Sequence, residues 1–449
     1  MTNEEKKRYL TPKNKGFFLS EKWALSLEDS FRNIAVIAPS GGGKTLRAFI
    51  GNILKCPGSM AITDPSGEIE KLTSGYLEKR GYHIQRLALA DPLTSLHYNP
   101  LKRRKTKQEL KQLAETLCLN TIGRGSNSDP FWLITPINMI YLIFLALKNH
   151  PDPGYANLFN TRKLVNNFAV IDEQSGHSRT RTFMETYLDD EDFEEYERIL
   201  TYDSKLLTSI VASAAAALDL WSDPDVVKIS SDDTVDLEAI RNKKTVIYIN
   251  IPQDKIEYYS LLANLFYSDC FELCIKNPKG EPVFYFLDEF ANLGIVNNFS
   301  TIITTIRKYR CCISIIIQGF SQLKEIYGAN KAETILHSGI SHKIYFAGIQ
   351  EAETLGYVSM MLGNITVYDN FWAELFKGFS ERSHTVARPL MSPDEIRMMK
   401  DEMAIVISKN RRPILIRMPW YSQIAELVKL TQVDRMAWKQ TDPATKTLR

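Results

Sequence analysis

Residues 34–45 read I-A-V-I-A-P-S-G-G-G-K-T and are the most informative part of the chain. An apolar run of strand character ends at a glycine-rich turn, and a helical pattern begins after Lys44 and Thr45. Strand, glycine-rich loop and helix in this order are typical of a phosphate-binding loop. Glycines let backbone amides converge on an anion, and the following helix points its positive end at the same anion. The stretch therefore predicts a nucleotide site.

Each position of this loop has an expected role. Lys44 can reach the terminal phosphates of ATP, and the Thr45 hydroxyl can ligate Mg²⁺. Ala38 stands where the pattern usually opens with glycine, a change that a strand end tolerates. The alternative is a glycine-rich turn that carries a surface lysine. We expect the nucleotide to contact Pro39, Ser40, Gly41, Gly42, Gly43, Lys44 and Thr45.

The composition is that of a globular protein. The chain has 449 residues, 44% of them hydrophobic and 24% charged, which predicts one large domain or two to three ordinary ones. Its formal net charge of +2 argues neither for nor against nucleic acid. No pair of the 6 cysteines has metal-site spacing, so we expect reduced core cysteines of a cytosolic protein.

No segment reads clearly as a membrane or export signal. The first residues, M-T-N-E-E-K-K-R, are polar, unlike a signal peptide. The most apolar stretch, 131–147, is marginal in length for a bilayer and contains Thr135, Pro136 and Asn138. A buried helix is therefore expected there, rather than a membrane span.

Strand and helix patterns alternate in two separate parts of the chain. Between about 101 and 225 the strand patterns stop, and helical patterns follow one another from 107–119 to 204–220. Alternating strands and helices predict an α/β fold with a mainly parallel sheet, interrupted here by an all-α inserted domain. We expect a lead-in at 1–30, a discontinuous nucleotide-binding domain at 31–100 and 226–420, the inserted domain at 101–225 and a tail at 421–449, short and helical at best.

Two charged runs accompany the inserted domain. Residues 102–105 read K-R-R-K, and residues 189–197 read D-D-E-D-F-E-E-Y-E. Such runs are usually solvated faces of helices or loops. The alternative is that either run is a docking surface, the acidic one for a basic partner. The sequence leaves both alternatives open.

An acid pair supplies the second half of the predicted site. The apolar run 283–287 leads directly into Asp288 and Glu289. Asp288 is placed to hold Mg²⁺ through water, and Glu289 to orient or deprotonate the attacking water. The alternative is a pair of acids that caps the strand. Buried carboxylates need partners, which favours the catalytic assignment.

Two further side chains are candidates for the reaction. Gln318 follows the apolar run 312–317, where an amide can bond the γ-phosphate or the water. Arg307 and Arg310 precede that run, and phosphoryl transfer benefits from an arginine that a neighbouring subunit often supplies. The alternatives are a polar cap at the strand end for Gln318 and exposed helix residues for the arginines.

A series of motifs resembles the TraG-type DNA-transfer ATPases, the coupling proteins of type IV secretion and conjugation. In chain order the matching stretches are Ala38 to Thr45, T-D-P-S-G-E at 63–68, Y-N-P-L at 98–101, L-D-E-F-A-N-L-G at 287–294, Q-G-F-S-Q-L at 318–323 and R-P-L-M-S-P-D-E at 388–395. The resemblance covers most of the chain from about 31 to 420. The stretches at 287–294 and 318–323 are the most specific.

The resemblance implies a RecA-like P-loop ATPase domain with an all-helical insertion. It implies ATP and Mg²⁺ as cofactors and a hexamer with ATP sites between its subunits. The alternative is that the protein is a monomer when no ligand is bound. By position, Lys44 and Thr45 correspond to the phosphate and Mg²⁺ residues, Asp288 and Glu289 to the acid pair, and Gln318 to the γ-phosphate sensor. Arg307 falls where the family has its trans-acting arginine, which lifts it above Arg310.

The partners that the resemblance implies are single-stranded DNA with its relaxase, or protein substrates. It also implies secretion-channel ATPases and inner-membrane components, and a cytoplasmic location peripheral to the bacterial membrane. Family members usually carry transmembrane helices before the motor domain, and none is visible here, so the chain either borrows a membrane partner or is truncated. Ser66 also stands where the family commonly has lysine.

Three functions are therefore weighed. The first is an ATP-hydrolysing coupling protein that drives DNA or protein to a secretion channel. The second is an ATP-gated substrate receptor without processive translocation. The third is a DNA-translocating ATPase outside secretion. An intact set of Lys44, Asp288 and Glu289 favours hydrolysis over gating, and the helical insertion favours the secretion family.

Overall fold

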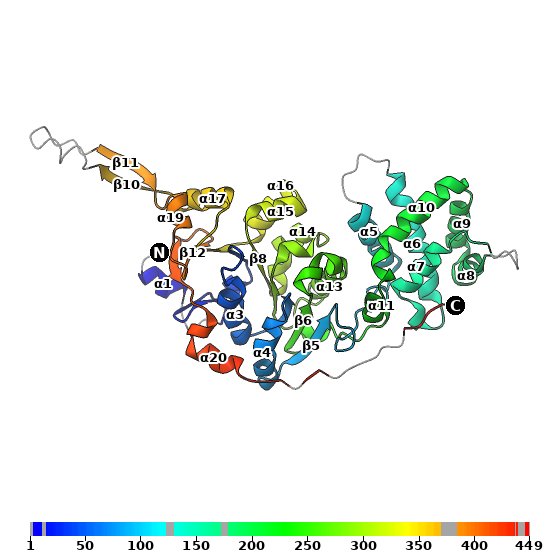
Figure 1. Cartoon of the computed structure of the whole chain (residues 1–449), viewed down its shortest axis with the longest axis horizontal. Coiled ribbons are helices and arrows are strands. Elements are labelled where there is room, and N and C mark those ends of the chain that lie inside the picture. The colour runs from blue at the N-terminus through cyan, green and yellow to red at the C-terminus, as the bar shows by residue number, and fades with distance from the viewer. Residues whose placement is uncertain are drawn as a thin grey trace, which may run out of the picture.

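A nine-stranded sheet forms the centre of the protein (Figure 1). The computed structural model describes residues 3–10, 15–122, 130–171, 178–369, 384–435, 437–438 and 445–448. From one edge to the other, the strands are β13 (Ile414–Arg417), β12 (Met403–Ser408), β9 (His342–Phe346), β3 (Ile34–Ile37), β8 (Cys311–Ile317), β7 (Val283–Leu287), β4 (Ser59–Asp64), β6 (Thr245–Asn250) and β5 (His83–Ala88).

The sheet is mainly parallel, as the sequence predicts. All pairs from β9 to β5 are parallel, and only β12 pairs antiparallel with β9 and with β13. The central strands are buried along their whole length. A strand that is covered on both faces reads as a continuous apolar run rather than an alternating one, which explains the β-branched character of β3 and β8.

Helices cover both faces of this sheet. Ile34 and Val36 of β3 belong to one core cluster, and Ala35 and Ile37 to another, because successive side chains point to opposite faces. The first face is covered by α3 (Ile50–Lys55), α4 (Glu68–Lys79) and α20 (Ala425–Thr431), and the second by α13 (Ile256–Lys276), α14 (Phe299–Thr305) and α15 (Phe320–Tyr327).

The helical region lies beyond the β5 edge of the sheet (Figure 1). Its helices are α5 (Lys107–Ile122), α6 (Phe131–Asn149), α7 (Leu158–Asn166), α8 (Arg179–Tyr187), α9 (Asp190–Leu200), α10 (Ser204–Ala217) and α11 (Pro224–Ser231). Helix α6 contacts α5, α7, α8, α9 and α10. Among the described residues it is the one helix long and apolar enough to cross a membrane, and 61% of its apolar window is buried inside the fold, as in the core helix that the sequence predicts.

Buried ion pairs join the helical region to the sheet. Arg104 lies 2.6 Å from Asp269 of α13, which also accepts a 2.6 Å hydrogen bond from the Tyr98 hydroxyl. Arg103 lies 2.7 Å from Asp233. The central arginines of the basic run at 102–105 are thus used inside the molecule, and they are not part of a docking surface.

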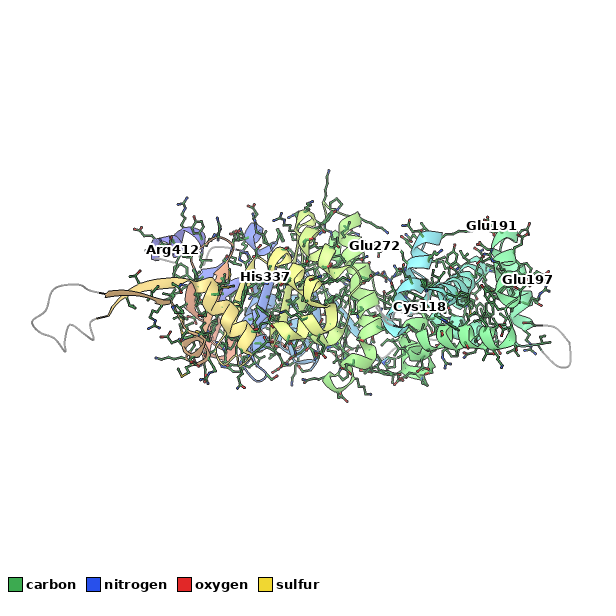
Figure 2. The ribbon with its side chains drawn as sticks, turned by 90° about the horizontal axis from the view of Figure 1, so that it is seen from above. Cys118, Glu191, Glu197, Glu272, His337 and Arg412 are labelled. Carbon is green, nitrogen blue, oxygen red and sulfur yellow. The ribbon has the colours of Figure 1, made fainter. Side chains whose placement is uncertain are left out.

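The acidic run lies at the other end of the helical region and forms most of α9. Figure 2 shows Glu191 and Glu197 there, away from the sheet. Lys107 lies 2.7 Å from Asp192, and Arg181 lies 2.9 Å from Glu197. Much of the acidic charge is therefore solvated or paired within the chain.

Smaller elements complete the fold. A hairpin of β10 (Asn364–Asp369) and β11 (His384–Pro389) extends away from the sheet, and the sequence analysis did not predict it (Figure 1). The other described elements are α1 (Asn3–Tyr9), β1 (Phe18–Ser20), β2 (Trp23–Ala24), α2 (Leu27–Ser30), α12 (Ala239–Asn242), α16 (Ala329–Glu333), α17 (Ala352–Leu362) and α19 (Pro393–Arg397). The 6 cysteines are free and buried.

Asn33 connects several elements at the amino ends of the parallel strands. Its side-chain amide donates to the carbonyls of Ile303 (2.7 Å) and Gly339 (2.9 Å), and its side-chain oxygen accepts from the Ile313 N–H (2.9 Å). The residue is buried and has φ 60°, a backbone conformation that asparagine tolerates better than most residues. The start of β3 is thereby fixed to α14 and β8.

Candidate functional site

The phosphate-binding loop follows β3 in the predicted order. Gly41 and Gly43 have φ +74° and +65°, which suit glycine, and the loop leads into a π-helical turn at Thr45–Phe49 and then α3. A Cβ on Gly43 would lie 2.2 Å from the ring of Trp420. Trp420 follows β13, so the loop is bounded by a residue from the far edge of the sheet.

Thr45 and Asp288 meet directly. The Thr45 hydroxyl donates a 2.5 Å hydrogen bond to Asp288 Oδ2, although β8 separates the strands that lead to them. Asp288 is buried, and this burial raises the pKa of its carboxyl to about 6 against the opposing effect of the Thr45 hydrogen bond. A hydroxyl and a carboxylate side by side are the two protein ligands that a nucleotide-bound Mg²⁺ requires.

Lys44 and Glu289 also meet. Lys44 Nζ lies 2.5 Å from Glu289 Oε1, and both side chains are largely buried. Glu289 has φ 49° and ψ 44°, a left-handed conformation that is strained for a residue with a side chain. Strain of this kind persists where the surroundings hold it, and here the acid sits between β7 and a 3-10 turn at Phe290–Leu293.

Gln318 lies at the end of β8, between the loop and the acid pair in the strand order. Its backbone N–H donates to Gln322 Oε1 (2.9 Å), while its half-buried side-chain amide makes no hydrogen bond among the residues that the structure describes. The Glu351 carboxylate accepts from the N–H groups of Phe320 (2.8 Å) and Ser321 (2.9 Å), which fixes the start of α15 next to it.

Arg307 does not join this group. It lies in a 3-10 turn at Ile306–Tyr309 before β8, whereas Gln318 follows the other end of that strand. The seven residues of β8 alone separate the two ends of the strand by about 20 Å. The Arg307 side chain is exposed and has no ion pair or hydrogen bond within the described part of the chain. It cannot reach the loop of its own subunit.

Asp64 is a site residue that the sequence analysis left without a role. It ends β4, next to β7, and is buried, with one carboxyl oxygen accepting from the Glu70 N–H (2.8 Å). Burial, assisted by the charges of Glu70 and Asp288, raises the pKa of Asp64 to about 6. Its position after an apolar strand is the same signal that identified Asp288.

Arg47 was missed for a different reason. Its Nε donates to the Met418 carbonyl (2.8 Å), one of its terminal nitrogens to the Gly42 carbonyl (3.3 Å), and its guanidinium lies 4.1 Å from the centre of the Phe346 ring. Arg47 thus ties the phosphate-binding loop to β9 and to the segment after β13. No local pattern announces a partner 371 residues away.

Comparison with known proteins shows the family of the chain. The family model described as "Type IV secretory system Conjugative DNA transfer" matches residues 2–447. The chain is 26% identical over 403 residues to Protein VirD4 of Agrobacterium fabrum, covering 85% of this chain and 57% of that protein. It is 26% identical over 393 residues to the probable conjugal transfer protein TraG of Sinorhizobium fredii, covering 84% of this chain and 60% of that one. It thus spans somewhat more than half the length of these relatives.

Solved structures show the same fold. The bacterial conjugative coupling protein TrwBdeltaN70 in complex with sulphate superposes with a TM-score of 0.69 at 16% identity, covering 99% of this chain and 96% of that one. The plasmid coupling protein TrwB in complex with ADP and Mg2+ gives the same score. The predicted RecA-like P-loop fold is confirmed. With a match that runs almost from end to end, the chain belongs to the conjugative DNA-transfer family of type IV secretory systems.

Proposed function

We propose that this chain is the ATP-hydrolysing part of a type IV coupling protein, which recruits relaxase-bound DNA or a protein substrate and drives it to a secretion channel. The observation that carries the proposal is the double contact of Thr45 with Asp288 and of Lys44 with Glu289. Four side chains from two distant segments are brought together by the sheet. A purely structural set of acids would not need a glycine loop beside it.

ATP and Mg²⁺ fit the residues present. The loop from Pro39 to Gly43 would receive the phosphates, and Lys44 would neutralise their charge. Thr45 and Asp288 would hold the metal, whose role is to offset charge on the phosphate oxygens. TrwB is described in complexes with ADP and Mg2+ and with an ATP analogue, which supports the same cofactors here.

The catalytic roles follow from the charges. Glu289 would accept a proton from the attacking water, and Gln318 would orient that water or contact the γ-phosphate. Phosphate binding to Lys44 would draw it away from Glu289 and leave the carboxylate free for this task. Asp64 would add a third acid beside Asp288, which keeps the local charge sensitive to protonation.

Arg307 would complete the site of a neighbouring subunit. Its distance from its own loop and its exposed, unpaired side chain support a role in trans, and a ring of six subunits is the arrangement that the family resemblance implies. We further propose that 31–100 and 226–420 form the motor domain, that 101–225 form an inserted domain, and that the protein works at the cytoplasmic face of the membrane with inner-membrane and channel components of the secretion system.

The testing experiment measures ATP turnover per subunit against protein concentration, with and without single-stranded DNA. A motor with shared sites turns over faster per subunit as concentration rises, and faster again with DNA. The Lys44→Ala variant is the matched blank for contaminating ATPases. Measurable nucleotide binding without turnover at any concentration would favour an ATP-gated receptor and contradict the proposal.

A further inference from the structure

The last described residues of the chain lie in an extended conformation against α7. The Asn160 side chain is fully buried and binds this segment at two points. Its amide donates to the Lys446 carbonyl (3.0 Å), and its oxygen accepts from the Leu448 N–H (3.0 Å). An asparagine that pairs with the main chain of residues i and i+2 recognises an extended peptide whatever its side chains are.

Neighbouring groups of the helical region add to this contact. The Asn157 amide also donates to the Lys446 carbonyl (3.3 Å), and Lys163 donates to the Leu448 carbonyl. All these bonds reach the same side of the segment, as the geometry of an extended chain requires. Thr447 is exposed.

Two side chains of the segment have complementary surroundings. Lys446 Nζ lies 2.6 Å from Asp152 Oδ2, and its aliphatic stem passes over Gly154, where a Cβ would lie 2.6 Å from it. Leu448 packs on the hydrophobic core of the helical region. It lines a cavity of about 430 Å³ together with the apolar Leu164, Val170 and Phe183, and Lys163 and Arg179 line the same cavity.

Apart from the Asn160 side-chain oxygen, which accepts from the Leu448 N–H, the walls of the cleft are held by hydrogen bonds of their own. Asn157 caps α7 by accepting from the Asn160 N–H (2.8 Å), and its amide also donates to the Gly154 carbonyl. Asn160 likewise donates to the Tyr155 carbonyl (2.9 Å). The walls are thus set by α7 and the turn before it, while the segment contributes no helix or strand.

A second contact brings the same part of the chain to the sheet. Val433 lies so close to α4 that a Cβ on Gly75 would be 1.9 Å from its carbonyl oxygen. The Trp438 indole N–H donates to Glu70 Oε1 (2.5 Å), and the Arg435 guanidinium lies 3.5 Å from the centre of the Trp438 ring. The chain is therefore held on α4 before it reaches α7 (Figure 1).

We propose that the cleft beside α7 is a binding site for an extended peptide, with the chain's own residues 445–448 as its resident ligand. The site reads main-chain groups through Asn160, a lysine through Asp152 and an apolar side chain through the cavity. Because the ligand is tethered, it competes at high effective concentration with any other peptide. The site becomes available when the tail is released.

The test uses the full chain with the double substitution Lys446→Glu/Leu448→Lys, which places a carboxylate against Asp152 and a cation beside Lys163 and Arg179. The probe is a fluorescein-labelled peptide T-D-P-A-T-K-T-L-R, corresponding to residues 441–449. We expect fluorescence anisotropy to show binding at least about tenfold tighter to this variant than to the unaltered chain. The full chain with Thr447→Ala is the matched control and should exclude the peptide as the unaltered chain does.

Altered peptides keep the test independent of protein folding. N-methylation at the position of Leu448 removes the N–H that donates a hydrogen bond to Asn160 Oδ1. Binding should weaken by about tenfold, since this buried acceptor is left without a partner. A peptide with glutamate for Lys446 should bind at least about fivefold more weakly. Asp152→Asn, added to the double variant, removes the charge but keeps an acceptor for the Gly154 N–H, and should reduce that fivefold difference.

Two results would overturn the proposal. One is equal affinity of the peptide for the unaltered chain and the double variant, including no binding to either. The other is undiminished binding of the N-methylated peptide, which would mean that Asn160 does not read the main chain.

Discussion

The charged side chains at the two ends of the parallel strands differ in their burial and in their partners. At the carboxyl ends of the strands, Lys44 and Glu289 are largely buried and lie 2.5 Å apart. At the amino ends, Arg307 is exposed and has no partner within the described part of the chain. The carboxyl ends carry the side chains that we propose to bind phosphate and metal. The amino ends carry a cation that makes no ion pair with any described residue of its own subunit.

This difference indicates which charged groups can act within one subunit and which need a neighbouring subunit. Burying a cation beside an anion is stable only when both are present, so the carboxyl edge assembles during folding. An exposed arginine stays hydrated, so it has no desolvation cost in the absence of a partner. The variants below change one edge at a time, and they separate groups that act within a subunit from groups that act between subunits.

The largest expected effect is from Arg307→Ala. If a neighbour's phosphate is its target, turnover should fall by about a thousandfold while the affinity for ATP is unchanged, because the arginine meets charge that develops only in the transition state. Phosphate release and equilibrium binding of a labelled ATP analogue measure the two quantities. Lys308→Ala, next to it in the same turn, should change neither.

Mixing experiments sharpen this result. Arg307→Ala and Lys44→Ala subunits each lack half of a shared site, so hybrid rings should recover part of the turnover. A mixture with no more activity than either variant alone would argue against an inter-subunit role of Arg307.

Next in size is the carboxyl edge. Glu289→Gln should lower turnover by at least about a hundredfold and preserve ATP binding, since only the proton acceptor is lost. Lys44→Ala should lose both. The matched controls are Glu426→Gln and Lys55→Ala. Each removes one partner of an exposed ion pair between α20 and α3. Full turnover in Glu289→Gln would remove the catalytic assignment of that acid.

Asn33→Ala should act on stability. We expect a loss of about 3 kcal/mol in the free energy of unfolding, from the buried hydrogen bonds together with the left-handed backbone. Asn298 has φ 53° but is exposed and has no such bonds among the described residues, so Asn298→Ala should cost only about 1 kcal/mol. Urea denaturation measures both, and equal losses would mean that the hydrogen bonds of Asn33 contribute little.

The smallest of the expected changes in stability depends on pH. Burial raises the pKa of Asp288 to about 6, above its ordinary value. Its charge therefore destabilises the fold at neutral pH, and this penalty disappears as pH falls towards 4. Asp288→Asn should raise the free energy of unfolding by about 1–2 kcal/mol at pH 7.5 and by much less at pH 4.5, while abolishing turnover. The exposed Asp254→Asn should do neither, and a gain independent of pH would contradict this origin.

Local patterns predicted the parallel sheet, the P-loop and the helical insertion because each depends on neighbours in sequence. The continuous apolar run of β8 reflects burial on both faces, and the glycines reflect the turn that they make. The β10–β11 hairpin left no such mark. The same limit applies to the chain end, where the expectation of a short helical tail covers α20 but not the contacts of Trp438 and Leu448.

For the site, sequence reasoning selected four side chains that the structure brings together, but it could not say which of them pair with each other. Lys44, Thr45, Asp288 and Glu289 come together, as strand ends in one sheet must. Arg47 and Asn33 escaped notice because their partners are remote in sequence, and an arginine in a helix or an asparagine before a strand is common. The catalytic roles, and that of Arg307, stay predictions until the variants are measured.

The buried pairs of Arg103 with Asp233 and of Arg104 with Asp269 have a mechanical consequence. Removing one partner of such a pair costs about 3–5 kcal/mol, because the other charge is left without its counter-charge in a largely buried place. The base of the helical region is thereby fixed to α13 and to the segment before β6.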